Sequence, residues 1–389
     1  MPYAPPDRSY CDADSHVMET REWLEPFADP AIRPRLRPFD PDLSMHRPEH
    51  LPLEHAGSLD ALRGRLDEPE ARAEAEKMLM LAKEWAALGA SDPGERKVAL
   101  DLLGFEAQLV FPTFAWMQFS GPEDIDLLYG GAQALCRAMA AFCSDDPRLH
   151  AVGLIPMADP ERDAALAEEA IELGCRALQL CKEPPGDISP AHPDYDPLWA
   201  RLQEAGVPFV LHIGNDGRHL HRAFYNNGIP RTSEFMMDGE SLLSKDLMTI
   251  SHAAEAFLNA IVLDGVLERF PRLRGGCIEL GALWVPSWLR KLDLVQKVFV
   301  RAEPHLDLPM RASDYVRRAL KFTPYSQEPV GWMIEQAGPE LFLFSSDYPH
   351  PEGGRNPLKR FQESLVGIPE DALERFYAGN FRELLGTQI

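Results

Sequence analysis

Short apolar segments alternate with helical patterns from residue 107 onward, and this alternation restricts the possible folds more than any other feature of the sequence. Seven apolar segments have the length of strands, namely 107–112, 150–156, 176–181, 207–212, 273–280, 320–324 and 342–347. Helical patterns separate most of them, at 124–143, 160–174, 195–206, 244–270, after 280 to about 300, and at 328–337, and further helices continue to 385. Short strands that are apolar on both faces and joined by helices predict a parallel sheet with a covered outer face.

An additional strand is predicted at Tyr10–Val17, which brings the number of strands to eight. Eight such units predict an α/β fold, a closed (β/α)8 TIM barrel, formed by a single domain over residues 1–389. A doubly wound open sheet is the alternative, but no G-x-G-x-x-G motif follows any of the strands. Residues 20–95 are predicted to form an insertion after the first strand, proline-rich at 22–56 and amphipathic and helical at 67–89. We expect this insertion to cap the barrel mouth or to form a subunit contact.

Composition and charge exclude several classes of partner. The formal net charge of −22 argues against nucleic acid or an anionic membrane surface, since both require a basic protein surface. No segment approaches the ~18 consecutive apolar residues of a membrane span, and the N-terminal residues lack the pattern of a signal peptide. The six cysteines are scattered, without a C-x-x-C pair, which is typical of a reducing compartment. We therefore expect a cytoplasmic protein with a small-molecule substrate.

The first strand carries two polar side chains that are unusual for a buried segment. Side chains alternate along a strand, so Asp14 and His16 share one face while Ser15 points to the other. Buried carboxylate and imidazole groups are unfavourable unless a partner satisfies them. A divalent cation would satisfy both, because these ligands suit Zn, Mn or Fe. A solvated strand end is the simpler interpretation of these two residues on their own.

Three other predicted strands also carry polar residues at or near their carboxyl ends. In a parallel barrel these ends meet at one mouth. His212 ends the fifth strand and Asp347 the eighth, while Glu279 lies within the apolar sixth. A single His at such a position is often structural, and an Asp before Tyr-Pro is often a turn or cap residue. Together, however, the five residues predict a divalent metal site, with the candidate ligands Asp14, His16, His212, Glu279 and Asp347.

Several motifs of this chain resemble the amidohydrolase superfamily. They are D-x-D-S-H at 12–16, VLH at 210–212, GVLERFPRLRGGCIELGALWVP at 265–286, FSSDYPHPEG at 344–353 and GNFRELLG at 379–386. The sequence is most similar to the amidohydrolase-related branch, which includes aminocarboxymuconate semialdehyde decarboxylase and the resorcylate-type decarboxylases. The resemblance extends from about residue 10 to 386 and is weakest over the insertion.

This resemblance implies that Asp14, His16, His212 and Asp347 hold a divalent metal ion. The strand-six segment of the family usually provides a catalytic His, whereas this chain has Glu279, which differs in charge and in resting pKa. His252, in the helix after the fifth strand, is expected either to act as an acid or base in the site or simply to pack.

The roles of three further residues are left open by the sequence. Glu19 could orient His16, or could bind a second metal ion together with Glu279. Lys182 follows the fourth strand, where binuclear superfamily members place a carboxylated lysine, although a solvated surface position is the simpler expectation. His350 is expected to support Asp347.

The resemblance implies a metal-dependent hydrolase, in which the metal ion activates a water molecule and polarises a carbonyl group of the substrate. Asp347 would take the proton of the water, and Glu279 would protonate the leaving group. Non-oxidative decarboxylation is the alternative, followed by iron-dependent oxygenation and by a non-catalytic binding role. Four aromatic residues near strand ends indicate an aromatic or apolar substrate, or else simple packing: Phe114, Trp116, Trp284 and Tyr348. The branch often forms dimers, so a homodimer is expected.

Overall fold

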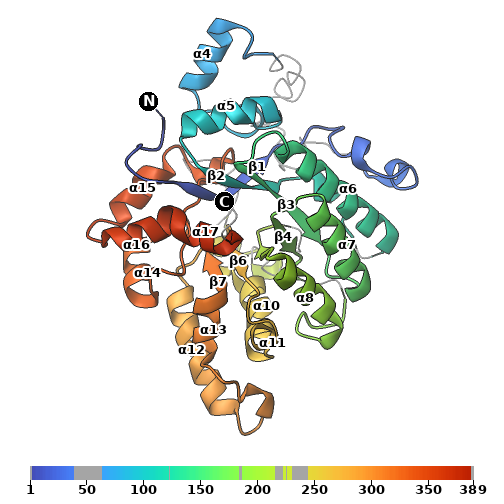
Figure 1. The fold of residues 1–389 in the computed structure, drawn as a ribbon, viewed down its shortest axis with the longest axis vertical. Helices are drawn as coiled ribbons and strands as arrows, with labels where there is room; N and C mark the ends of the chain where they lie inside the picture. The colour runs from blue at the N-terminus through green and yellow to red at the C-terminus, as the bar shows by residue number, and fades with distance from the viewer. Residues whose placement is uncertain are drawn as a thin grey trace.

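Seven parallel strands, hydrogen-bonded in the order β1 to β7, form the centre of the molecule (Figure 1). The computed structural model describes residues 2–38, 64–121, 123–183, 186–214, 222–224, 226–229 and 244–386. The strands are β1 (Cys11–Val17), β2 (Ala107–Pro112), β3 (Leu149–Ile155), β4 (Ala177–Leu180), β5 (Phe209–Leu211), β6 (Gly275–Cys277) and β7 (Leu320–Phe322). All strand residues are buried, as expected for a parallel sheet covered by helices. The predicted α/β TIM-barrel fold is therefore confirmed.

The eighth position of the barrel differs from the prediction of a regular strand at 342–347. This segment makes only two isolated parallel bridges, Phe342 with Phe322 of β7 and Tyr348 with Ser15 of β1. Between them the N–H of Ser346 donates to the side chain of Asp12 rather than to a strand carbonyl. The segment nevertheless connects β7 with β1 and so closes the ring of strands.

The helices between the strands largely follow the predicted pattern. They are α6 (Ile125–Cys143), α7 (Pro160–Glu172), α8 (Asp196–Ala205), α12 (Val285–Phe299) and α14 (Val330–Ala337), followed by α15 (Pro357–Ser364), α16 (Glu370–Glu374) and α17 (Asn380–Leu385). The single helix predicted at 244–270 is wrong, because the chain forms α9 (Ser244–Thr249), α10 (His252–Leu263) and α11 (Val266–Arg269). Gly265, with a φ of 77°, separates the last two. The sequence pattern did not reveal α13 (Ala312–Ala319).

In the described part of the insertion, α4 (Pro69–Lys77) is shorter than the helix predicted at 67–89, and α5 (Pro93–Leu103) begins where the insertion ends. Residues 39–63 of the insertion, including 39–56 of the proline-rich stretch predicted at 22–56, lie outside the described residues. The turns between the helices fold back onto the barrel: the N–H of Glu84 donates to Pro349 O at 2.9 Å, and Trp85 Nε1 donates to Glu19 O at 2.9 Å. The described part of the insertion therefore packs against the carboxyl end of β1 and the loop after the eighth segment.

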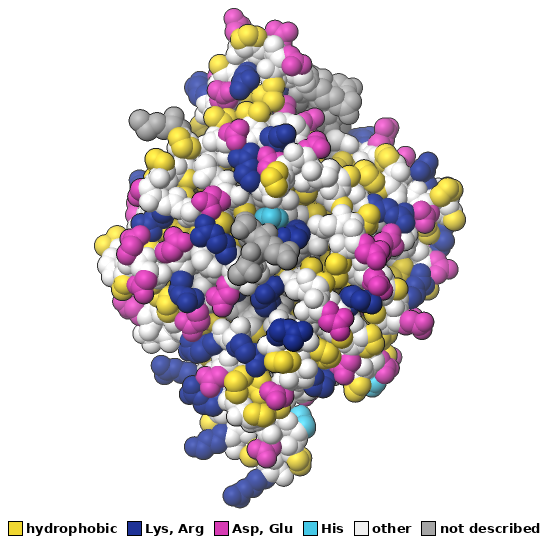
Figure 2. All heavy atoms as spheres, in the orientation of Figure 1, with side chains coloured by type: hydrophobic (Ala, Val, Ile, Leu, Met, Phe, Trp, Pro, Cys, Tyr) yellow, Lys and Arg dark blue, Asp and Glu magenta, His cyan; other side chains and the backbone are white. Residues whose placement is uncertain are grey.

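The interior of the barrel is apolar at the amino ends of its strands. Inward-facing strand residues form a cluster with α17, which includes Cys11, Ala13, Leu109, Val152, Val210, Ile278 and Leu343 and, from the C-terminal region, Ala378, Phe381, Leu384 and Leu385. Figure 1 shows α17 lying across the strands near the centre of the view. On this face, acidic and basic side chains are intermixed rather than separated into patches (Figure 2). None of the described helices has both the length and the apolar character needed to span a bilayer.

Candidate metal centre

A register shift in β1 places the first two polar side chains at the barrel mouth. The pairing of β1 with β2 is irregular between Asp12 and Ser15, so that Ala13 belongs to the interior cluster and yet Asp14 also faces the interior. The hydroxyl of Ser15 donates to Leu109 O at 2.7 Å on the other side of the strand. Asp14 and His16 are each 1% exposed, and this places a carboxylate and an imidazole together in a buried site.

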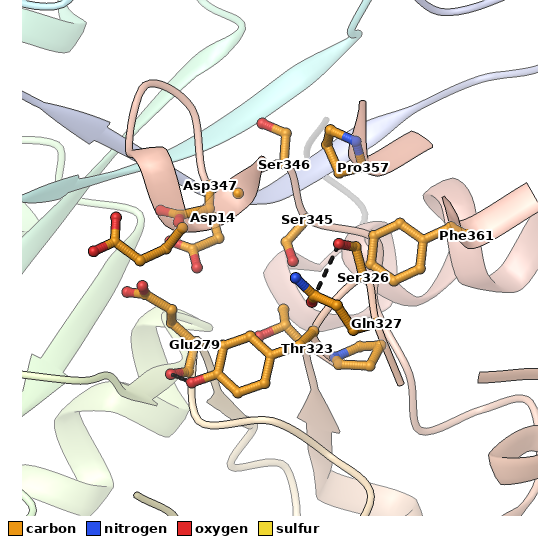
Figure 3. Close-up of a pocket in the computed structure, with 14 residues that line it drawn as sticks. Asp14, Glu279, Thr323, Ser326, Gln327, Ser345, Ser346, Asp347, Pro357 and Phe361 are labelled. Carbon is orange, nitrogen blue, oxygen red and sulfur yellow. Dashed lines mark hydrogen bonds between the residues drawn. The ribbon is translucent and has the colours of Figure 1, made fainter. Parts of the chain in front are cut away.

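The five residues predicted to form the centre converge at the carboxyl ends of the strands. His16 Nε2 lies 3.2 Å from Asp14 Oδ1, 3.5 Å from Asp347 Oδ1 and 3.8 Å from Glu279 Oε2. His212 Nε2 lies 3.3 Å from both Asp14 Oδ1 and Glu279 Oε2. Figure 3 shows the carboxylates of Asp14, Glu279 and Asp347 gathered on one side of a pocket. Chain segments more than 300 positions apart thus meet at one point.

Three atoms of this cluster are buried without a hydrogen-bond partner among the described residues: His16 Nε2, Glu279 Oε2 and Asp347 Oδ1. Leaving such groups unsatisfied is unfavourable by about 1–3 kcal/mol each, and by more where the group is charged. Two overlapping sets of side chains have ligand atoms within 4.8 Å of one another, namely Asp14, His16, His212 and Glu279, and His16, Glu279, Asp347 and His350. Their oxygen and imidazole donors fit a divalent cation of the Zn, Mn or Fe type.

Glu279 and Asp347 both have a left-handed backbone conformation, with φ values of 53° and 52°. The Glu279 backbone is fixed on both sides, because its N–H donates to Thr323 Oγ1 and its carbonyl accepts from the Tyr325 hydroxyl, each at 2.8 Å. The N–H of Asp347 donates to Asp14 O at 2.9 Å. Burial raises the pKa of Glu279 well above its usual value, and the nearby carboxylates of Asp347 and Asp14 raise it further.

The histidines are oriented by contacts on the side away from the cluster. His212 Nδ1 lies 2.8 Å from the carbonyl oxygen of Ile213, which identifies Nδ1 as the donor and leaves the lone pair of Nε2 facing the carboxylates. The hydroxyl of Thr113 lies 3.4 Å from His16 Nδ1 and 3.0 Å from His350 Nε2. Burial lowers the pKa of His16 well below its usual value, and the charges of His350 and His212 add to this effect.

His350 lies closer to the cluster than the sequence indicated. Its ring stacks on His16 with the centroids 3.9 Å apart, and its Nδ1 lies 3.2 Å from Asp347 Oδ1. Burial opposes protonation, but the nearby charge of Asp347 outweighs burial and raises the pKa of His350 to about 9. The expected contact with Asp347 is present, and His350 is also a member of the second set of potential ligands.

Other predicted site residues are not brought into the cluster. His252 is exposed at the first position of α10, because the buried residues of this helix, including Ala254, Phe257 and Ile261, lie on the opposite side at about 100° of rotation per residue. Glu19 accepts the backbone N–H groups of Thr113, Phe114 and Ala115 at 2.9, 2.9 and 3.2 Å, so it orders the loop after β2 and does not contact His16 directly.

Lys182 is not the solvated surface residue that the sequence favoured. It is 4% exposed, and its Nζ donates to His212 O at 2.7 Å and to Gly214 O at 3.3 Å. The ammonium group thus holds the loop that follows β5. This position at the end of β4, next to β5, explains why the side chain is buried.

The four aromatic residues have different environments. Phe114 and Trp116 are half-buried in the loop after β2, and Phe114 stacks on Trp85 of the insertion, with ring centroids 5.7 Å apart. Trp284 packs edge-on against Phe322 and Trp288, and Tyr348 is fully buried with its hydroxyl donating to Leu88 O. Phe114 and Trp116 therefore remain candidates for substrate contact. Trp85, which no sequence signal identified, is 4% exposed and supports Phe114 from behind.

A small cavity, lined by both polar and apolar side chains, adjoins the cluster between the loops after β7 and after the eighth segment. It has about 20 Å³ of space for the centres of water molecules, which is room for one water. Asp14, Glu279 and Asp347 form one side, and the other side carries hydroxyl and amide groups of Thr323, Ser326, Gln327 and Ser345 (Figure 3).

Solved structures of similar fold include an amidohydrolase, map2389c, from Mycobacterium avium subsp. paratuberculosis K-10. It is 20% identical in sequence with a TM-score of 0.75, and the alignment covers 98% of this chain and 100% of that one. The 5-carboxyvanillate decarboxylase of Novosphingobium aromaticivorans, solved with manganese and 4-hydroxy-3-methoxy-5-nitrobenzoic acid, has a TM-score of 0.65 at 18% identity, covering 97% of this chain and 96% of that one. At these identities the similarity shows a shared fold.

Sequence comparison adds one curated relative, the decarboxylase orsB of Emericella nidulans. It is 26% identical over 257 residues, which is 65% of this chain and 74% of the relative. The amidohydrolase family model matches residues 11–387, and so covers almost the whole chain, including every residue of the cluster. The chain therefore belongs to the amidohydrolase family.

Proposed function

We propose that this protein is a metal-dependent decarboxylase that removes a carboxyl group, without oxidation, from a small aromatic or unsaturated acid. The observation that carries the proposal is the convergence of three buried atoms at the barrel mouth, on His16, Glu279 and Asp347, which have no hydrogen-bond partner in the described parts of the chain. Decarboxylation is favoured over hydrolysis because the curated relative is a decarboxylase and a structure of similar fold is one too.

The residues that would hold a divalent ion are Asp14, His16, His212, Asp347 and Glu279. When bound there, the ion would anchor and polarise a substrate carboxylate together with a neighbouring hydroxyl group. Manganese is the first candidate, because the structurally similar 5-carboxyvanillate decarboxylase was solved with it; zinc and iron suit the same donors.

Each turnover replaces the carboxylate by a proton: the carbon–carbon bond breaks, its electron pair stays on the ring carbon, and carbon dioxide leaves. Asp347 is the group proposed to deliver the proton to that carbon. His350 Nδ1 lies 3.2 Å from Asp347 Oδ1 and keeps the carboxyl group oriented. Phe114 and Trp116 would contact the apolar part of the substrate, with Trp85 behind them.

Hydrolysis remains a second candidate because the cavity beside Asp347 and Glu279 has room for a water molecule next to both acids. In that reaction Asp347 would take the proton of the attacking water, and Glu279 would protonate the leaving group. The substrate would then be an amide or an ester rather than a free acid.

The test uses purified protein loaded separately with manganese, zinc or iron(II). A panel of hydroxylated benzoic acids, amides and esters is assayed for carbon dioxide release, for bond hydrolysis and for oxygen uptake. Carbon dioxide release that depends on the metal and is lost in Asp347→Ala supports decarboxylation. If only amides or esters are cleaved, hydrolysis replaces decarboxylation as the proposed reaction. If the iron-loaded protein consumes oxygen, oxygenation replaces it.

A homodimer is proposed as the working assembly, with the insertion at the subunit contact. Light scattering on the purified protein measures its mass directly, against a chain mass of 43.6 kDa. A monomer at micromolar concentration would contradict this part of the proposal.

A further inference from the structure

Behind the first strand, three buried polar side chains form a connected set, which we call the Asp12–Gln108–Arg96 frame. All three are 0% exposed. Gln108 stands between the two charged residues: its Nε2 donates to Asp12 Oδ2 at 2.8 Å, and its Oε1 accepts from Arg96 Nη1 at 3.3 Å. An acceptor on one side and a donor on the other fix the orientation of the amide.

The Asp12 end of the frame contacts two of the three segments that carry acidic residues of the cluster, namely those of Asp14 and Asp347. Its carboxylate accepts from Ser346 N at 2.7 Å, from Ser346 Oγ at 2.6 Å and from Asp14 N at 3.3 Å. Ser346 precedes Asp347 at the place where the eighth segment lacks regular strand pairing, so the carboxylate takes the position of a strand carbonyl. One side chain thus joins two segments that are 334 positions apart.

The Arg96 end holds the carboxyl end of β1 and the turn of the insertion at Gly89. Arg96 Nη2 donates to the carbonyl oxygen of His16, and Nε donates to Gly89 O at 2.7 Å. Its guanidinium also lies over the ring of Tyr348, 5.4 Å from the ring centroid. The frame therefore touches the backbone of Asp14 and His16 directly, and that of Asp347 through its neighbour Ser346.

We infer that Asp12 and Gln108 are positioning residues of the metal centre, which set the spacing between the Asp14 and Asp347 carboxylates. This inference rests on the proposed function, because it takes those carboxylates as ligands. Residues that hold metal ligands in place typically change metal affinity by about 10–100-fold when replaced. A frame that served stability alone would leave the affinity of the folded protein unchanged.

The test measures manganese affinity by calorimetry and unfolding by urea for the same proteins. Asp12→Asn places an amide donor against Gln108 Nε2, and we expect manganese to bind at least about tenfold more weakly. Adding Gln108→Glu exchanges donor and acceptor across this contact. The manganese affinity of the double variant is expected to return to within about threefold of wild type. Asp163→Asn is the matched control, since Asp163 is a buried carboxylate that accepts from Tyr129 Oη and Met157 N away from the site.

If Asp12→Asn does not fold, Ser346→Ala provides the second variant. It removes the hydroxyl that donates to Asp12 and accepts from Tyr348 N, and it is expected to weaken manganese binding by about three- to tenfold. A destabilised Asp12 or Ser346 variant that binds manganese as tightly as wild type would overturn this inference and leave the proposed function intact. Wild-type protein that binds no divalent metal would overturn the proposed function, and this inference with it.

Discussion

The two ends of the barrel are closed in opposite ways. At the amino ends of the strands, Phe381 and Leu384 of α17 seal the interior with apolar side chains. At the carboxyl ends, Asp14, Glu279 and Asp347 face one another in a buried position. The first arrangement stabilises the fold, whereas the second adds unfavourable burial and electrostatic repulsion. In barrels of this type, polar groups at the carboxyl end belong to function and packing at the amino end to stability. Four measurements separate these contributions.

The largest effect is expected at the polar end. Asp347→Ala removes the proposed proton donor and a proposed ligand, and we expect turnover to fall by about a thousandfold. The free energy of unfolding should change little, because the lost repulsion with Glu279 is offset by the lost attraction to His350. Steady-state kinetics and urea unfolding on the same sample check both parts. Activity close to wild type would contradict the role given to Asp347.

At the apolar end the expected pattern is reversed. Phe381→Ala opens a cavity between α17 and the strands, which should lower the free energy of unfolding by about 3–5 kcal/mol. Manganese affinity at a temperature where the variant is folded should remain that of wild type. A large loss of affinity would show that the two ends are not energetically separate.

A buried histidine lies at the apolar end and gives it a pH dependence. His150 is 5% exposed, its ring centroid is 6.1 Å from that of Phe381, and burial, followed by the charge of Arg176, lowers its pKa to about 4. Because the unfolded chain binds this proton more tightly, stability is lost as the pH falls from about 6.5 to 4. We expect a loss of roughly 2 kcal/mol from this residue, measured as the difference in urea unfolding between wild type and His150→Leu across that range.

The smallest effect is expected outside both ends. His252→Ala should leave turnover and metal content within about twofold of wild type, because the side chain is exposed and belongs to neither set of potential ligands. Kinetics and elemental analysis check this expectation. A strong loss of turnover would show that α10 moves toward the site when substrate binds.

Much of this contrast could be predicted from the sequence, because alternation of strands and helices fixes the barrel, and the barrel fixes where strand ends meet. Asp14, His16, His212, Glu279 and Asp347 are close together for that reason alone. Residues on strands keep their register through backbone pairing, so their position follows from the pattern.

The contributions of Asp12 and His350 could not be predicted in the same way. Simple alternation puts Asp12 on the same face as Asp14, but the register shift in β1 turns it outward, toward Gln108. His350 follows an irregular segment, where no periodicity gives the direction of a side chain. The position of His252 was missed because a helix boundary, at Ser251, decides which way the first residue points.

The left-handed conformation of Glu279 has a consequence for how such sites diverge. At a φ of 53°, backbone sterics favour Asn, Asp or His over a longer acidic side chain. An imidazole at this position would therefore fit the existing backbone at least as well as the carboxylate does. Glu279→His would therefore exchange the carboxylate for an imidazole without a new backbone conformation at position 279.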